Sequence, residues 1–327
     1  MAASQSATGK AIAANTGSAL RQMEPAESAA RAAIARSRRI VIKIGTNTIT
    51  RQKNAPARIS AGTDDRGSID IEYLHRIAAE IADLVREGRQ IILVTSGAVG
   101  MGAKALGLVR KPKQTRAKQA CAAIGQPLLM EEYRKAFDVY GLTAAQLLVT
   151  RDVWDRRAAY LHLRDTVEAL LEQRVIPVFN ENDSVSTAEI AFGDNDQLSA
   201  YVASKIDAEL LVILSDVDML YDADPRGNPD ACPIPYVREL SGEILDSAGG
   251  NGTEFSTGGM RTKLLAVGVA RDAGCRVVIA HGRVPRVISS ILAGGPSGTL
   301  FDATSELRNR ERWIKNKIGR ASCRERV

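Results

Sequence analysis

The chain of 327 residues can bury one large core or two modest ones, and its 45% hydrophobic and 25% charged residues are typical of a soluble globular protein. No apolar stretch approaches the roughly 20 residues that cross a membrane, so we expect no membrane span. The net charge of +6 suggests nucleic-acid binding, but residues 1–39 carry +4 and residues 304–327 carry +5, which leaves −3 on residues 40–303. The basic charge therefore lies at the two ends, and the central part offers no surface for a phosphate backbone.

The two ends also differ from the rest of the chain in composition. Residues 1–37 are rich in Ala, Ser and Gln and have few large apolar side chains, which predicts a disordered leader. A transit peptide is an alternative because the segment bears Arg and few acids, although Glu24 and Glu27 argue against it. The last ten residues, IGRASCRERV, continue no earlier pattern and resemble a translated sequencing adapter. We expect one domain over residues 38–303 and a truncated linker with a non-native tail over residues 304–327.

The four cysteines, Cys121, Cys232, Cys275 and Cys323, lie far apart in the sequence and form no C-x-x-C pair. This spacing predicts neither a zinc site nor a disulfide framework. We therefore expect a reducing compartment, the cytoplasm.

Short β-branched runs alternate with helical patterns along residues 38–303. The run Ile40–Ile44 predicts a buried strand that ends at Gly45, the polar residues 51–68 predict a loop, and residues 70–88 predict a helix. Further strands are predicted in the stretches that begin at residues 90, 142, 175, 208 and 275, with helices between them. This alternation favours an α/β fold with a mostly parallel sheet covered on both faces. In such sheets ligands bind at the carboxyl ends of the strands.

The first two strand ends carry features that suit an anionic ligand. Lys43 lies between Ile42 and Ile44, where an unpaired ammonium would be costly, although a lysine at a strand edge is the ordinary alternative. The segment VTSGAVGMG places Ser96, Gly97 and Ala98 where a strand becomes a helix. Small residues there let backbone N–H groups approach an anion, while a tight turn that needs Gly for its geometry is the structural alternative.

Two later stretches are also unusual. FNENDSVSTAEIAFGDND, residues 179–196, gathers Asp183, Asp194 and Asp196 among asparagines, and a surface loop made acidic for solubility is its simplest alternative. STGGMRTK, residues 256–263, sets a glycine pair before a lysine at the start of a helical segment. It is not a Walker A motif, and no G-x-G-x-x-G fingerprint follows a strand.

These features suit phosphoryl transfer from ATP to a small amino acid. The charge on the transferring phosphoryl group calls for cations, and Lys43 and Lys263 come from different loops, with Asp196 able to hold both ammonium groups. Mg²⁺ takes oxygen ligands, mainly from phosphate and water. Asp183 and Asn195 suit the ammonium and acid groups of an amino acid. An acceptor carboxylate needs no general base, so ordinary surface or core roles are expected for the three histidines, His75, His162 and His281.

Five motifs together resemble the glutamate 5-kinase branch of the amino acid kinase family. They are VIKIGTNTIT, ILVTSGAVGMG, KQACAAIGQPLLM, PVFNENDSVSTAEIAFGDNDQLSA and STGGMRTK, and they occur in the family's order over residues 38–301. NEND, GDND and TGGMRTK favour this branch over acetylglutamate kinases, aspartokinases and UMP kinases. A kinase for another acid, or a sensor that binds but does not turn over, is the rival interpretation.

The resemblance implies a three-layer αβα sandwich with a mainly parallel, eight-stranded sheet. It implies transfer of the γ-phosphate of ATP to the γ-carboxylate of L-glutamate, giving glutamyl 5-phosphate, the first intermediate of proline synthesis. Lys43, Asp196 and Lys263 would act on the phosphoryl group. Glutamate would be bound by Ser96, Gly97, Ala98, Asp183 and Asn195. ATP would be bound by Lys43, Ser215, Asp216, Thr257, Gly258, Gly259, Met260, Arg261, Thr262 and Lys263.

The resemblance also implies feedback inhibition by proline and a homo-oligomer, either a dimer or a tetramer. Two features depart from the family pattern. Ser215-Asp216 stands where Thr-Asp is usual, which keeps the hydroxyl. RNRERWIKNKI resembles the junction that leads to a C-terminal PUA domain in bacterial members, so we expect a kinase domain without that domain.

Overall fold

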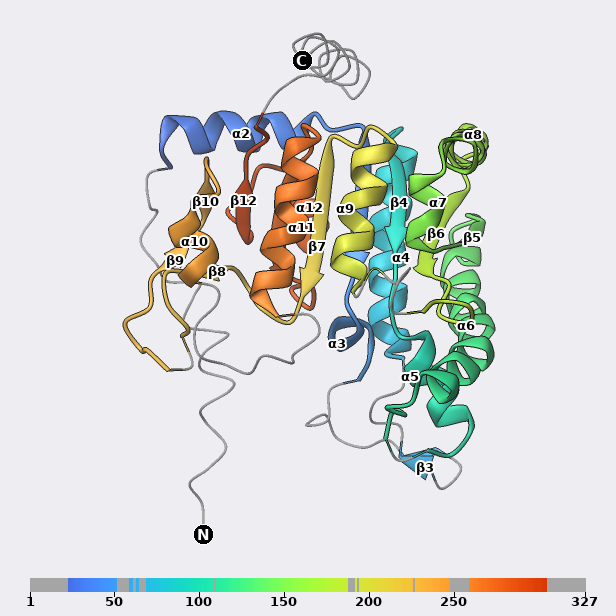
Figure 1. Ribbon diagram of the computed structural model, residues 1–327. Coiled ribbons are helices and arrows are strands. Elements are labelled where there is room, and N and C mark those ends of the chain that lie inside the picture. The colour runs from blue at the N-terminus through green and yellow to red at the C-terminus, as the bar shows by residue number, and fades with distance from the viewer. Residues whose placement is uncertain are drawn as a thin grey trace, which may run out of the picture.

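The computed structural model describes residues 23–51, 59–60, 63–64, 69–108, 110–187, 192, 194–225, 227–247 and 259–304. An eight-stranded sheet runs through the molecule in the order β10-β12-β11-β7-β1-β4-β6-β5 (Figure 1). Its strands are parallel except for β12, which is antiparallel to β11, and β10, which runs with β12. The strands are β1 (Arg39–Ile44), β4 (Gln90–Val94), β5 (Ala144–Val149), β6 (Ile176–Glu181), β7 (Leu210–Ser215), β10 (Tyr236–Val237), β11 (Arg276–His281) and β12 (Thr299–Phe301).

Helices cover both faces of the sheet, which confirms the three-layer αβα sandwich. One apolar core joins the sheet to α2 (Pro25–Ala35), α4 (Ile71–Arg86), α6 (Thr115–Asp138) and α12 (Val287–Leu292). The other joins it to α7 (Arg151–Asp155), α8 (Arg157–Glu172), α9 (Asn195–Lys205) and α11 (Met260–Asp272). Shorter elements are α3 (Thr46–Ile49), α5 (Ala98–Ala105), α10 (Gly242–Ser247) and the strand pairs β2 (Ile59–Ser60) with β3 (Thr63–Asp64) and β8 (Leu220–Tyr221) with β9 (Pro233–Ile234).

The central strand β1 shows how the sequence divides side chains between the two cores. Successive side chains of a strand point to opposite faces, so Ile40, Ile42 and Ile44 pack toward α4 and α12. Val41 packs on the other face, toward α9 and α11, and Lys43 shares that face. The Lys43 side chain therefore points toward the starts of α9 and α11, although a lysine is unusual in a continuous apolar strand.

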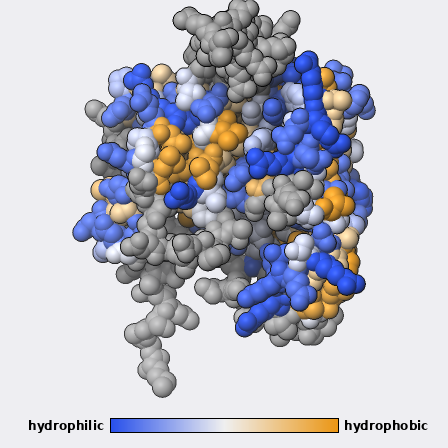
Figure 2. Space-filling view, in the orientation of Figure 1, coloured by the Kyte–Doolittle hydropathy of each residue, from blue (hydrophilic) through white to orange (hydrophobic). Residues whose placement is uncertain are grey.

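On the face seen in Figure 2 the described residues are largely polar, with apolar side chains gathered over α11. Leu265 and Val269 on this helix are 50% and 38% exposed. None of the helices within the described ranges is both long enough and apolar enough to pass through a bilayer.

The predicted disorder of residues 1–37 does not hold for the segment that the structure describes. Residues 25–35 form α2, whereas residues 1–22 lie outside the described ranges. Ile34 is fully buried, and the buried Arg31 pairs with Glu27 at 3.0 Å. The same guanidinium donates to the carbonyl oxygens of Gly295 (2.7 Å) and Pro235 (3.2 Å). The helix is therefore held to the rest of the fold by Ile34 and by hydrogen bonds from Arg31 to main-chain carbonyls, and the latter cannot be predicted from the number of large apolar residues.

Candidate active site

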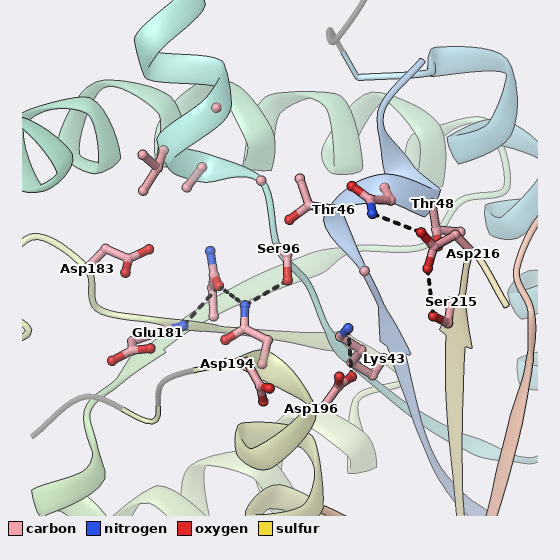
Figure 3. A pocket seen from close by; sticks show the side chains of 18 of the residues that line it. Lys43, Thr46, Thr48, Ser96, Glu181, Asp183, Asp194, Asp196, Ser215 and Asp216 are labelled. Carbon is pink, nitrogen blue, oxygen red and sulfur yellow. Dashed lines mark hydrogen bonds and ion pairs between the residues drawn. The ribbon is translucent and has the colours of Figure 1, made fainter. Parts of the chain in front are cut away.

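A cavity of about 290 Å³ opens at the carboxyl ends of β1, β4, β6 and β7 (Figure 3). Both α5 and α9 begin at this cavity, and the first turn of α11 contributes Lys263. The predicted residues that line it are Lys43, Ser96, Gly97, Ala98, Asp183, Asn195, Asp196, Ser215, Asp216 and Lys263. Residues from six separate segments thus converge where a parallel sheet is expected to bind its ligand.

Lys43, Asp196 and Lys263 form a buried charge cluster at the floor of the cavity. The Lys43 Nζ lies 2.7 Å from Asp196 Oδ1, and the Lys263 Nζ lies 3.2 Å from Asp196 Oδ2. The three side chains are at most 8% exposed. One carboxylate therefore fixes two ammonium groups that arrive from β1 and α11.

Asp196 stays ionised, so the cluster of two ammonium groups and one carboxylate carries a net charge of +1. Burial on its own would raise the pKa of the Asp196 carboxyl, but the ammonium groups of Lys43 and Lys263 outweigh it and hold this pKa below its usual value. Two ammonium groups against one carboxylate leave one positive charge in a site shielded from water. Such a site attracts an anion.

Two glycines make room for this arrangement. A Cβ on Gly45 would lie 3.1 Å from the Lys43 Nζ, so a larger residue would press on the ammonium. Gly97 caps α5 with a φ of 113°, a left-handed conformation that favours glycine. The first turn of α5 thereby presents its backbone N–H groups at the edge of the cavity.

The opposite end of the cavity is built from asparagines and acids. The Asn195 Nδ2 donates to the Thr95 carbonyl oxygen (2.6 Å), the Ser96 Oγ (2.9 Å) and the Asn180 Oδ1 (2.9 Å). These bonds tie the start of α9 to the ends of β4 and β6. Six polar residues of the stretch 179–196 therefore line the cavity, namely Asn180, Glu181, Asp183, Asp194, Asn195 and Asp196.

The carboxyl of Asp183 binds a proton more tightly than an exposed aspartate does. Burial raises its pKa to about 6, the neighbouring carboxylate of Glu181 adds to the rise, and Lys118 opposes it. Glu181 itself accepts hydrogen bonds from the Ser186 Oγ (2.6 Å) and the Phe192 N–H (3.2 Å). A ligand ammonium beside Asp183 would favour its ionised form.

Asp216 lies at the end of β7, where a second segment fixes it. The Asn47 Nδ2 donates to one carboxylate oxygen at 2.9 Å, and the Ser215 Oγ donates to the other at 3.1 Å. Burial would raise the pKa of Asp216, but these hydrogen bonds keep it below its usual value. The Ser215 hydroxyl, which replaces the usual threonine, is thus used to orient Asp216.

The predicted nucleotide loop is described only in part. Thr257 and Gly258 lie outside the described residues. Gly259 caps α11, and the Thr262 Oγ1 donates to its carbonyl oxygen at 2.8 Å. Met260, Arg261 and Thr262 belong to the first turn of α11, and of residues 259–263 only Lys263 lines the cavity.

Several lining residues were not predicted as site residues, namely Gly45, Thr46, Asn47, Thr48, Val99, Gly100, Lys111, Asn180, Glu181 and Asp194. Asn180 and Glu181 lie within the acidic stretch of residues 179–196. Their position next to the predicted site residues was therefore the sign in the sequence that they could also line the site. Lys111 precedes α6 in a basic segment without a motif, and burial lowers its pKa. Among the described residues, no cluster of three or more His, Cys, Asp or Glu side chains could hold a metal by itself.

Curated relatives resemble the chain over most of its length. It is 44% identical over 293 residues to "Glutamate 5-kinase" of Methanosarcina acetivorans, covering 88% of this chain and 74% of that protein. It is 42% identical over 278 residues to the protein of the same name from Thermus thermophilus, covering 85% and 71%.

Solved structures of lower identity share the fold. A UMP kinase from Bacillus anthracis matches with a TM-score of 0.54 at 16% identity, covering 82% of this chain and 97% of that one. An isopentenyl phosphate kinase matches with a TM-score of 0.53 at 19% identity, covering 80% and 99%.

The model of the "Amino acid kinase family" matches residues 38–281. With that match and the site geometry in agreement, the chain belongs to the amino acid kinase family.

Proposed function

We propose that this protein transfers the γ-phosphoryl group of ATP to the γ-carboxylate of L-glutamate, which gives ADP and glutamyl 5-phosphate, the first step of proline biosynthesis. The observation that carries the proposal is the buried cluster of Lys43, Asp196 and Lys263 beside a pocket of amides and acids. The relatives named "Glutamate 5-kinase" at 42–44% identity support glutamate as the acceptor.

The chemistry needs charge neutralisation more than proton transfer. A carboxylate oxygen of the acceptor forms a bond to the γ-phosphorus while the bond from that phosphorus to the bridging oxygen of ADP breaks. The acceptor is already ionised at neutral pH, so no base has to remove a proton. Charge spreads over the phosphoryl oxygens during transfer, and the ammonium groups of Lys43 and Lys263 would stabilise it.

Asp196 keeps the two ammonium groups in place before the nucleotide arrives. Because its carboxylate already holds them, little reorganisation is needed when the phosphoryl group carries most charge. Asp216 and Ser215 would contact the nucleotide from the end of β7. Mg²⁺, held mainly through the nucleotide phosphates, would neutralise part of their charge.

The acceptor would lie at the end of the cavity near α9. Asp183 would bind the ammonium of glutamate, and the first turn of α5 from Ala98 would donate backbone N–H groups to a carboxylate. The Ser96 Oγ accepts a hydrogen bond from the Asn195 Nδ2 (2.9 Å) and lines the same cavity as the charge cluster. This arrangement directs the side-chain carboxylate toward the phosphoryl group.

We infer that proline, which carries the same ammonium and carboxylate groups as the substrate, inhibits the enzyme from this pocket. We also infer a homo-oligomeric, cytoplasmic enzyme. Inhibition by proline should weaken as glutamate is raised, and light scattering of the purified chain would give its mass in solution.

The test of the proposed reaction is ATP consumption with glutamate, aspartate, N-acetylglutamate and carbamate offered in turn. Glutamate should be the preferred acceptor. Preference for another acid would overturn the substrate, and absence of turnover with every acceptor would favour a non-catalytic sensor that keeps the fold.

A further inference from the structure

Four side-chain amides form a continuous line from the edge strand β5 to the acceptor end of the cavity. The Gln126 Nε2 donates to the Gln146 Oε1 (3.1 Å), and the Asn180 Nδ2 donates to the Gln126 Oε1 (2.8 Å). The Asn195 Nδ2 then donates to the Asn180 Oδ1 (2.9 Å). Gln146 is exposed, whereas Gln126 and Asn180 are 7% and 1% exposed. In each of these three hydrogen bonds the NH₂ group belongs to the residue farther from β5 and the oxygen to the residue nearer β5. All three bonds therefore point the same way.

Two main-chain groups fix that direction. The Glu181 N–H, which can only donate, lies 3.0 Å from the Asn180 Oδ1 and requires an oxygen there. The Thr95 carbonyl, which can only accept, lies 2.6 Å from the Asn195 Nδ2 and requires a nitrogen there. Exchanging the oxygen and nitrogen of either asparagine amide would place two donors or two acceptors against each other in a buried position. The Asn180 NH₂ group must therefore face Gln126, and the Gln126 side chain must accept the hydrogen bond through its Oε1.

This direction decides which atom of Asn195 is left for a ligand. Its NH₂ group is engaged by Thr95, Ser96 and Asn180, and within the described part of the chain no donor reaches its Oδ1. Asn195 lines the cavity together with Asp183. An amide oxygen and a carboxylate at one end of a cavity suit a cationic donor such as an ammonium.

We propose that Gln126 is a positioning residue, which orients Asn180 and through it Asn195, so that Asn195 presents its oxygen to the ammonium of the amino-acid acceptor. The inference rests on the proposed function, because it assumes an amino acid in this pocket. It also revises the role of Asn195, whose amide accepts from the ammonium and is not free to donate to the acid groups of the substrate.

Substitutions at Gln126 separate this role from simple packing. Gln126→Glu keeps an oxygen facing Asn180 whether or not the new carboxyl is protonated. Gln126→Met has a similar length but no partner for Asn180, and Gln126→Lys offers only donors. We expect the KM for glutamate to rise about tenfold in the Met variant, more in the Lys variant and least in the Glu variant. The KM for ATP should change less than about twofold, because the other end of the cavity is untouched.

Packing alone predicts the reverse order, because a buried Met fills the space of Gln whereas a buried Glu is penalised. Steady-state kinetics of the full chain, with thermal midpoints for each variant, would decide between the two. Gln173→Met, at an exposed position after α8, is the matched control and should leave both KM values unchanged. A Met variant that equals or surpasses the Glu variant in its KM for glutamate would overturn the proposal.

Two further outcomes keep the inference separate from the proposed function. If the Met variant at Gln126 does not fold, Gln146→Met at the exposed end should still raise the KM for glutamate by about two- to fivefold, and an unchanged KM would count against the line. If the unmodified chain consumes ATP only with another amino acid, the proposed substrate fails. The order of the Gln126 variants is then measured with that amino acid.

Discussion

Asp196 concentrates two ammonium groups at one point of the cavity, and its low pKa keeps the cluster ionised well into the acid range. A group that acts on developing charge contributes more to turnover than to binding or folding. The single side chains around the cavity can therefore be separated by which kinetic constant each one changes.

Lys263→Ala should reduce kcat by about a hundredfold or more, because one of two cations at the transferring phosphoryl group is lost. The variant should stay folded, since Lys43 still pairs with Asp196 at 2.7 Å. Lys135→Ala, which removes an exposed lysine paired with Glu132 on α6, is the matched control. Near-normal turnover by the Lys263 variant would show that its assigned role is wrong.

Asp183 should impose a pH dependence on glutamate use. Its carboxyl takes up a proton as the pH falls through about 6, and a neutral carboxyl attracts the substrate ammonium less. We expect kcat/KM for glutamate to fall about tenfold per pH unit below that value, with a smaller change in the KM for ATP. Asp183→Asn should have a low kcat/KM without this acid limb, and an unchanged limb in that variant would assign it to another group.

The raised pKa of Asp183 also has a stability consequence of defined sign. The folded state binds this proton more tightly than the unfolded chain, so stability falls as the pH rises from the ordinary aspartate pKa of 3.8 to about 6, and the loss is complete at neutral pH. Asp183→Asn should therefore unfold at an equal or higher urea concentration than the unmodified protein at neutral pH. A clear loss of stability would indicate a structural contact for this side chain.

Among the secondary-structure elements, α5 and α6 pack at backbone distance through two glycines. A Cβ on Gly102 would lie 1.8 Å from the Cys121 carbonyl oxygen, and one on Gly125 would lie 1.9 Å from the Ala98 carbonyl oxygen. No side chain fits at either position without displacement. Because α5 begins at Ala98, this packing also sets where its first turn meets the cavity.

Gly125→Ala should destabilise the protein by about 1–3 kcal/mol and raise the KM for glutamate, because α5 must move away from α6. Urea unfolding and acceptor kinetics would measure the two effects. The control is Gly242→Ala at the start of α10, where an added Cβ would meet nothing within 4 Å. Equal behaviour of the two variants would contradict close packing as the determinant of the α5 position.

At the scale of the whole molecule, α2 fastens the chain before β1 to the far edge of the sheet. Arg31 reaches carbonyls of the segments before β10 and β12 while it pairs with the buried Glu27. Arg31→Met should reduce stability by about 3–5 kcal/mol, since it breaks the buried ion pair with Glu27 and the guanidinium hydrogen bonds to the Gly295 and Pro235 carbonyls. Arg36→Met, at an exposed position, is the control in urea unfolding, and similar midpoints would remove the anchoring role.

The sequence could predict the parts of the fold that repeat a pattern. Long apolar strands such as β1 and β7 and the amphipathic α4 were predicted from hydrophobic periodicity. The edge strand β10 and its neighbour β12 were not located, because they have two and three residues and show no period. The polar residues 51–68, predicted as a loop, contain the short pair β2–β3, which is equally hard to read from a pattern.

The sequence predicted a site residue where burial of that residue type without a partner would be energetically unfavourable. Lys43 drew attention because an ammonium within an apolar strand needs a partner. Gln126 and Gln146 gave no such signal, because a glutamine is ordinary on a helix or an edge strand. Their role depends on which atoms face each other across three elements, and that is a property of the assembled fold.

The charge cluster at the cavity floor has a consequence for biosynthesis on the ribosome. The first strand emerges early, whereas α9 and especially α11 follow far later in translation, so Lys43 waits for both of its neighbours. A growing polypeptide that has not yet reached Lys263 cannot assemble the complete set of charges. The ability to handle a nucleotide thus arises only after α11 has been synthesised, when β1, β4, β6 and β7 already exist.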